Sequence, residues 1–211
     1  FFDDAKYYIK HMTDAANAAS IALSELPVPF LSSFMGGLVT GYDMRDVNNQ
    51  GTKYNASGCL IHGLSVATDS IIAIEEYLKV YPNDPERLLN AIRSNFENDS
   101  DIRAFLKKAP KYGNNMPTPD TLAQEISLKI SDYVKSMKNY LNNGFRADWS
   151  TPSTHLLYGY WVGATADGRL AREMLGYGID PLYGEATMGL GFRILSCMNL
   201  PFDEMDGGYA S

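Results

Sequence analysis

Cysteine is scarce in this chain: Cys59 and Cys197 are the only two among 211 residues. Two cysteines are too few for the disulfide framework of a small secreted protein, and their spacing does not match a zinc site. Together with the two cysteines, the three histidines, His11, His62 and His155, do not form the set of closely spaced pairs that metal motifs show. We therefore expect reduced thiols and no metal site.

Long apolar runs and basic runs are absent as well. No apolar stretch reaches the roughly 18 to 20 residues that cross a bilayer. The first residues, FFDDAK, lack the basic start and apolar middle of a secretory signal. Acidic residues outnumber basic ones by 25 to 18, and no run of lysine or arginine offers a stripe for phosphates. We expect a cytoplasmic protein with neither a membrane nor a nucleic-acid partner.

The composition that remains is typical of a folded globular protein. Hydrophobic residues make up 45% of the chain and charged residues 20%, which is enough apolar material for a substantial core. Phe1 lies inside a helical pattern, and residues 207–211 stop where a strand begins. We therefore expect residues 1–211 to form a single segment of a barrel domain, as a fragment or as one part of a split chain.

Apolar residues at three- and four-residue steps predict several helices. The first is ended by Pro27 and Pro29, Thr68 caps another, and Gly144 closes the longest. The expected helices cover residues 3–26, 30–39, 99–108, 118–144 and 170–175, with further helices starting at residues 68 and 85. Residues 189–197 are ambiguous.

Short buried strands separate these helices. Residues 58–66 are apolar and flanked by glycines, and residues 150–158 are rich in β-branched and hydroxyl side chains. Helices that alternate with short strands, without an internal repeat, predict an α/β fold that is mostly helical, namely a sector of a β/α barrel.

Six short motifs occur in order along residues 29–209. They are PFLSS at 29–33, the block YNASGCLIHGL to TDSIIAI at 54–74, PKYGNN at 110–115, STH and YG within 153–159, GATADGR at 163–169, and LPF at 200–202. Each motif alone has residues that are common in turns of many proteins. Together they resemble the C-terminal half of the barrel of glycyl radical enzymes, and residues 63–70 are particularly similar to pyruvate formate-lyase-like members.

This resemblance implies a ten-stranded β/α barrel and radical chemistry. In the family, a stored glycyl radical takes a hydrogen from a loop cysteine, and the resulting thiyl attacks the substrate inside a dry pocket. A radical-SAM activating enzyme installs the glycyl radical. The resemblance also implies that no cofactor binds this segment, and that its partners are the rest of the enzyme polypeptide, the activase, a small-molecule substrate, and further copies or accessory subunits.

Neither radical-bearing residue of the family has a match here. The glycine motif is missing, and Cys59 aligns with a later barrel strand rather than with the cysteine loop. No residue of this segment is therefore expected to be catalytic, and the segment alone is expected to be inactive.

The resemblance places two strands at the substrate pocket. Because alternate side chains of a strand point the same way, Asn55, Ser57, Cys59 and Ile61 form one predicted set, and Trp149, Thr151 and Ser153 form another. A role in the core is an equal alternative for Cys59 and Ile61. His62 is included as a pocket residue, although a partly buried structural histidine is the commoner case.

A charged pair in the GATADGR motif has a structural interpretation. Asp167 and Arg169 lie beside Gly163 and Gly168, which mark a tight turn. We expect the pair to brace this loop rather than to act as an acid and its counter-charge.

The substrate is inferred from the character of the pocket strands. Their cysteine, isoleucine, leucine and tryptophan side chains favour an apolar substrate. This favours radical addition to fumarate, as in relatives resembling benzylsuccinate and alkylsuccinate synthases. Carbon–carbon cleavage like that of pyruvate formate-lyase and glycerol or diol dehydration are alternatives, as is a non-catalytic scaffold derived from the barrel.

Overall fold

The structure, a computed structural model, describes residues 1–52, 57–150 and 153–208. Its contacts divide the chain into two compact units. The first unit contains Phe1–Cys59 and Lys129–Ala147, and the second contains Leu60–Leu128 and Asp148–Ser211. Among the described residues, no helix has the length and apolar character needed to span a membrane.

The first unit begins with a long helix and a broken one. Helix α1 (Phe2–Leu23) confirms the predicted first helix and ends just before the prolines. The predicted helix over 30–39 is interrupted: α2 (Pro29–Ser32), the π-helix η1 (Ser33–Gly37) and α3 (Leu38–Thr40) follow one another. Gly36 has a φ of 107°, which lies outside helical geometry, so the helix cannot run through it.

The longest predicted helix is shorter than expected. Helix α7 covers Pro117–Ser136 and does not continue to Gly144. Asn139 Oδ1 instead accepts hydrogen bonds from the backbone N–H of Leu141 at 3.1 Å and of Asn143 at 2.9 Å. This side chain offers the backbone a turn in place of further helix.

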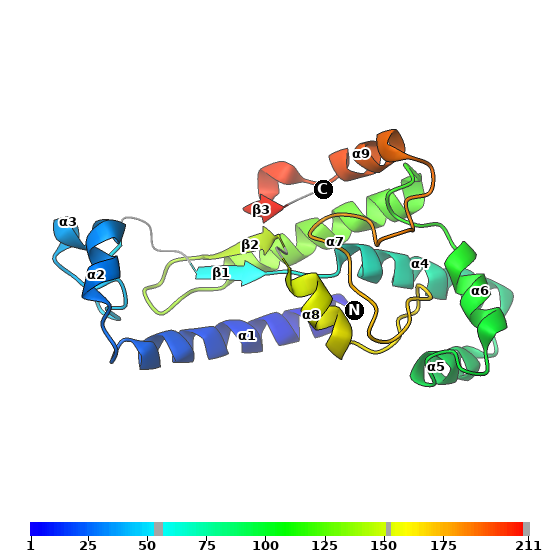
Figure 1. The fold of residues 1–211 in the computed structure, drawn as a ribbon, viewed down its shortest axis with the longest axis horizontal. Coiled ribbons are helices and arrows are strands. Elements are labelled where there is room, and N and C mark those ends of the chain that lie inside the picture. Colours follow the sequence, from blue (N-terminus) through cyan, green and yellow to red (C-terminus); the bar gives the residue numbers. More distant parts are fainter. Residues whose placement is uncertain (53–56, 151–152, 209–211) are drawn as a thin grey trace. The chain divides into compact units, whose positions relative to one another are not determined.

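Three consecutive helices form the core of the second unit. They are α4 (Leu64–Val80), α5 (Pro85–Arg93) and α6 (Ser100–Lys108). Buried residues from all three helices form a hydrophobic cluster that includes Tyr77, Leu88 and Leu106. The Pro85 helix start and the helix up to Lys108 are confirmed. Figure 1 draws these three helices in teal to green.

The predicted strand over 58–66 is correct only in its first part. Strand β1 covers Ser57–Leu60, and α4 begins at Leu64. Thr68 is therefore not a cap: it lies inside α4, where its hydroxyl donates to the Leu64 carbonyl at 2.8 Å. A short apolar run can belong to a strand or to a buried helix start, and its periodicity does not separate the two.

The second predicted strand lies earlier in the chain than expected. Strand β2 covers Phe145–Trp149, and residues 154–161 form helix α8 (Thr154–Trp161). Three strands form one sheet in the order β1-β2-β3, where β3 is Gly207–Gly208. Strands β2 and β3 are parallel, with Asp148 opposite Gly207.

The last segment contains little regular structure before α9 (Leu190–Met198) and the 3-10 helix η2 (Phe202–Glu204). The predicted helix over 170–175 is absent. Arg169 Nη1 donates to the carbonyls of Leu170 at 3.0 Å and of Glu173 at 2.6 Å, and Arg172 has a φ of 70°. A helix would need those carbonyls and a negative φ.

Candidate functional site

The predicted pocket residues of β1 lie on one face of that strand. Ser57 and Cys59 are both half-buried, whereas the residues between and after them are exposed. The Ser57 hydroxyl accepts a hydrogen bond from Asn139 Nδ2 at 3.3 Å. Burial raises the pKa of the Cys59 thiol, so it is protonated at neutral pH. Asn55, predicted for the same face, lies outside the described residues.

Ile61 and His62 continue from β1 into the second unit. The Ile61 N–H donates to the Asp148 carbonyl at 2.8 Å, so its backbone is bonded to β2. The imidazole of His62 lies 4.9 Å from the ring of Tyr158 between centroids. Burial, and secondarily the nearby His155, lowers the pKa of His62, so the ring is neutral at pH 7.

The predicted set on the second strand is divided by the structure. Trp149 is the last residue of β2 and is 1% exposed. Ser153 is exposed and is the N-cap residue of α8, so the strand alternation that grouped it with Trp149 does not apply to it. Thr151 lies outside the described residues. The use of these side chains in substrate binding remains a prediction.

A cavity in the second unit combines apolar and charged side chains. Its volume is about 410 Å³, within the range of small-molecule sites. Three leucines, Leu175, Leu182 and Leu190, give it an apolar part. The polar side chains of His155, Asp180 and Arg193 also line it.

The KYGNN motif holds the chain segment that forms this cavity. Tyr112 is fully buried, and its hydroxyl donates to the Ile179 carbonyl at 3.1 Å. Asn114 Nδ2 donates to the Glu185 carbonyl at 2.8 Å, and Asn114 Oδ1 accepts from the Thr187 N–H at 2.8 Å. These bonds fix both ends of the loop that contains Asp180.

Helix α9 is fixed by a second set of polar contacts. The Ser196 hydroxyl donates to Asp120 Oδ2 at 3.0 Å and accepts from the Asn115 N–H at 2.7 Å. Ser196 is fully buried, so these bonds are shielded from water. Arg193 is therefore on a helix whose position is set by α7 and by the KYGNN motif.

An ion pair joins the two walls of the cavity. Arg193 Nη2 donates to Asp180 Oδ2 at 2.6 Å, a short charge-assisted bond. The Asp180 side chain is 3% exposed and that of Arg193 is 29% exposed. The carboxylate is thus covered, whereas part of the guanidinium is open. His155 Nδ1 is buried without a hydrogen-bond partner in the described structure, and its ring meets Tyr177 edge-on at 5.0 Å.

The GATADGR loop is braced as the sequence predicted. Asp167 Oδ1 accepts from the Thr165 hydroxyl and from the Arg169 N–H. Arg169 is 1% exposed, and its guanidinium donates to the Thr165 hydroxyl and to the carbonyl of Gly163. Both charged side chains therefore hold the backbone of the turn.

Sequence reasoning missed the Asp180–Arg193 pair. The two residues are thirteen positions apart, on a stretch with little regular structure and on a helix whose sequence was ambiguous. No periodic pattern links them. Among residues 1–52, 57–150 and 153–208, no group of three or more histidine, cysteine or carboxylate side chains could hold a metal ion.

Comparison with known proteins connects these features to a family. The family model described as pyruvate formate lyase-like matches residues 1–159. The chain belongs to this family of glycyl radical enzymes. The resemblance deduced from the ordered motifs is thereby confirmed.

A curated relative and two solved structures illustrate this family membership. The trans-4-hydroxy-L-proline dehydratase of Clostridioides difficile is 27% identical over 208 residues, which cover 94% of this chain and 26% of that protein. The B12-independent glycerol dehydratase of Clostridium butyricum has a TM-score of 0.85 and 31% identity over 97% of this chain and 26% of its own. A glycyl radical enzyme of Archaeoglobus fulgidus has a TM-score of 0.86 and 25% identity, over 99% of this chain and 28% of its own.

These structural neighbours confirm the fold class. A mostly helical chain with a few short strands corresponds to part of a glycyl radical enzyme barrel. The chain spans about a quarter of the length of the relatives that it matches.

Proposed function

We propose that this chain forms part of the catalytic barrel of a glycyl radical enzyme that removes water from a small hydroxylated molecule. The observation that carries this proposal is its similarity to two dehydratases over almost all of its length: 94% for the hydroxyproline enzyme and 97% for the glycerol enzyme. Carbon–carbon cleavage like that of pyruvate formate-lyase is a second candidate, because the matching family model is described as pyruvate formate lyase-like.

The apolar strand residues favoured a different reaction, addition to fumarate. That prediction has no support among the relatives reported above. The structure also weakens its premise, because Leu60 lies on the exposed face of β1, opposite Ser57 and Cys59. An apolar strand residue that points away from the predicted pocket face carries no information about the substrate.

The reactive centre of the proposed enzyme lies outside these residues. A glycyl radical and a thiyl supply hydrogen abstraction in this family, and no residue of the chain matches either carrier. This chain contributes part of the pocket wall and helps to exclude water from the pocket. Cys59 remains a protonated thiol, and the buried Trp149 packs in the sheet. The segment alone is therefore proposed to be inactive.

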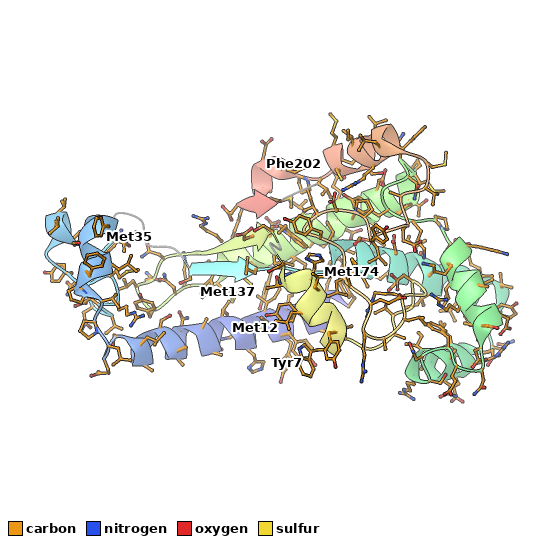
Figure 2. All side chains as sticks on the ribbon, in the orientation of Figure 1. Tyr7, Met12, Met35, Met137, Met174 and Phe202 are labelled. Carbon is orange, nitrogen blue, oxygen red and sulfur yellow. The ribbon has the colours of Figure 1, made fainter. Side chains whose placement is uncertain are left out.

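Exposed apolar side chains support the rest of the polypeptide as the main partner. Helix α1 exposes Tyr7 and Met12, shown on the helix in Figure 2. Helix α9 also exposes Ile194, Leu195 and Met198. Apolar areas of this kind are characteristic of surfaces that pack against other protein. A radical-SAM activase and further copies of the enzyme belong to the same proposal.

The test uses the intact polypeptide, activated anaerobically by its activase and S-adenosylmethionine. Electron paramagnetic resonance should detect an organic radical. The activated protein should then convert glycerol, propane-1,2-diol or trans-4-hydroxy-L-proline with loss of water, but neither toluene with fumarate nor pyruvate with coenzyme A. A radical with turnover of only the latter substrates would contradict the dehydratase proposal. Failure to form any radical would favour the non-catalytic scaffold.

A further inference from the structure

The cavity beside α9 contains a guanidinium with unused binding capacity. An arginine carries five N–H donors in a planar fork, and the structure records one bond from Arg193 to Asp180. The carboxylate of that pair is covered, whereas the arginine side chain is 29% exposed. The pair therefore orients the guanidinium and leaves part of its fork available to a ligand in the cavity.

The other walls define the rest of the ligand. Leu175, Leu182 and Leu190 provide an apolar surface, and the ring of His155 lies beside it. A wholly apolar ligand would cover the free guanidinium donors and leave them unsatisfied, which is costly. A strongly charged ligand such as a phosphate dianion would meet only one arginine, whose charge Asp180 already offsets.

We propose that this cavity binds a small monocarboxylate with an apolar body, whose carboxylate is held by Arg193 and whose body lies against the three leucines. The volume of about 410 Å³ accommodates such a molecule. The N-terminus of α9 also favours an anion in the cavity, because Leu190, the first residue of that helix, lines the cavity. The free N–H groups and positive dipole end of a helix favour an anion nearby.

The loop that forms one wall of the cavity contains two glycines with open space beside them. Gly184 and Gly189 line the cavity, with φ values of 85° and 104°. A Cβ built on either glycine would meet no atom within 4 Å. These positions therefore need glycine for their backbone geometry and not for close packing, and the space beside them is unfilled.

The test compares two probes that differ only in charge. Isothermal titration of the intact polypeptide with 3-methylbutanoate should give measurable binding. The isosteric amide, 3-methylbutanamide, should bind at least roughly tenfold more weakly, because it cannot form a charge-assisted pair with arginine. Each probe should also be tested by thermal shift, since a ligand that binds the folded state raises the melting temperature.

Three variants locate the binding. The double variant D180N/R193Q removes both charges without leaving an unpaired buried ion, and it should lose carboxylate affinity by at least about tenfold. R193K keeps the charge but not the planar fork, and should have an intermediate affinity. R87Q removes an exposed arginine that pairs with Asp99 and Asp101, and should bind like the unmodified protein.

Several outcomes would overturn the proposal. These are equal affinity for the acid and the amide, unchanged affinity in D180N/R193Q, and no binding of 3-methylbutanoate to a protein whose melting curve is normal. The proposal concerns binding alone and does not depend on the radical reaction. A protein that forms the radical but does not bind the probe would contradict this inference without affecting the proposed dehydratase.

Discussion

The backbone N–H of Tyr112 donates to Oδ1 of Asp69 at 2.8 Å, across 43 positions of the chain. Asp69 is on α4 and is fully buried, as is Tyr112. The second carboxyl oxygen, Oδ2, is buried and has no partner within the described structure. This bond attaches the KYGNN motif, and through it the cavity loop, to the helical core of the second unit.

Removal of this acceptor should destabilise the intact polypeptide. D69A leaves the Tyr112 N–H buried without a partner and creates a small void, so we expect a loss of about 2–4 kcal/mol. D69N keeps an acceptor oxygen of the same shape and should lose much less. Thermal or denaturant unfolding followed by circular dichroism measures both. Equal losses in the two variants would show that the bond to Tyr112 is not the main contribution.

The same carboxyl should make stability depend on pH. Burial raises the pKa of Asp69 from 3.8 to about 8. Between these values the folded state keeps a proton that the unfolded state has released, so the contribution of Asp69 to stability falls as pH rises through this window and is constant above about pH 8. D69N lacks this titration. The free energy of unfolding of D69N minus that of the unmodified protein should therefore be larger at pH 8 than at pH 5. An identical difference at both pH values would contradict the raised pKa.

Gly113 should not tolerate a residue with a side chain. Its φ is 98°, and a Cβ built there would lie 2.2 Å from Cγ of Pro181. The proline ring is rigid and cannot move aside, so G113A combines backbone strain with a clash and should cost about 3 kcal/mol or more.

The matched control is G41A, where φ is 79° and no atom lies within 4 Å of the added methyl group. We expect about 1 kcal/mol there, from the backbone alone. Similar melting temperatures for the two variants would exclude the clash.

Arg169 should not tolerate replacement by lysine. Its guanidinium is fully buried and bonds to the Thr165 hydroxyl and to the carbonyls of Gly163, Leu170 and Glu173. A lysine has three donors at one point and cannot reach this spread of acceptors, so R169K should cost about 2–4 kcal/mol.

The control for R169K is R172K in the same loop. Arg172 is exposed and lies over the ring of Tyr160 at 5.3 Å. A lysine retains a cation over the ring, so the change should cost less than about 1 kcal/mol. Thermal unfolding of both variants tests the prediction. If R169K melts like R172K, the loop does not depend on the guanidinium fork.

The sequence predicted helices where local signals were strong and misplaced elements where a side chain bonds nearby backbone groups in place of a helix. The Pro85 start of α5 follows from proline at the first helical position. The predicted helix over 170–175 fails because Arg169 takes its carbonyls, and α7 ends early because Asn139 bonds its own backbone neighbours. Neither bond can be read from hydrophobic periodicity.

Side-chain alternation on the two pocket strands was predicted only in part, and the use of these side chains in substrate binding stays a prediction. The alternation of Ser57 and Cys59 is a local property of a strand and was correct for the described residues of β1. The alternation in β2 was also present, in the buried Phe145, Ala147 and Trp149, but it precedes the β-branched stretch that was taken for the strand. The Asp180–Arg193 pair depends on tertiary structure supplied by Tyr112, Asn114 and Ser196.

The parallel pairing of Asp148 with Gly207 has a consequence for biosynthesis. The two residues are separated by about sixty positions, which a ribosome translates in roughly 3–12 s at its usual rate. During that interval the edge of β2 that will receive β3 has no neighbour, and such an edge can pair with another nascent chain. We expect newly made protein to depend on chaperone binding until Gly207 and Gly208 have left the ribosome, and to be prone to aggregation when it is produced quickly.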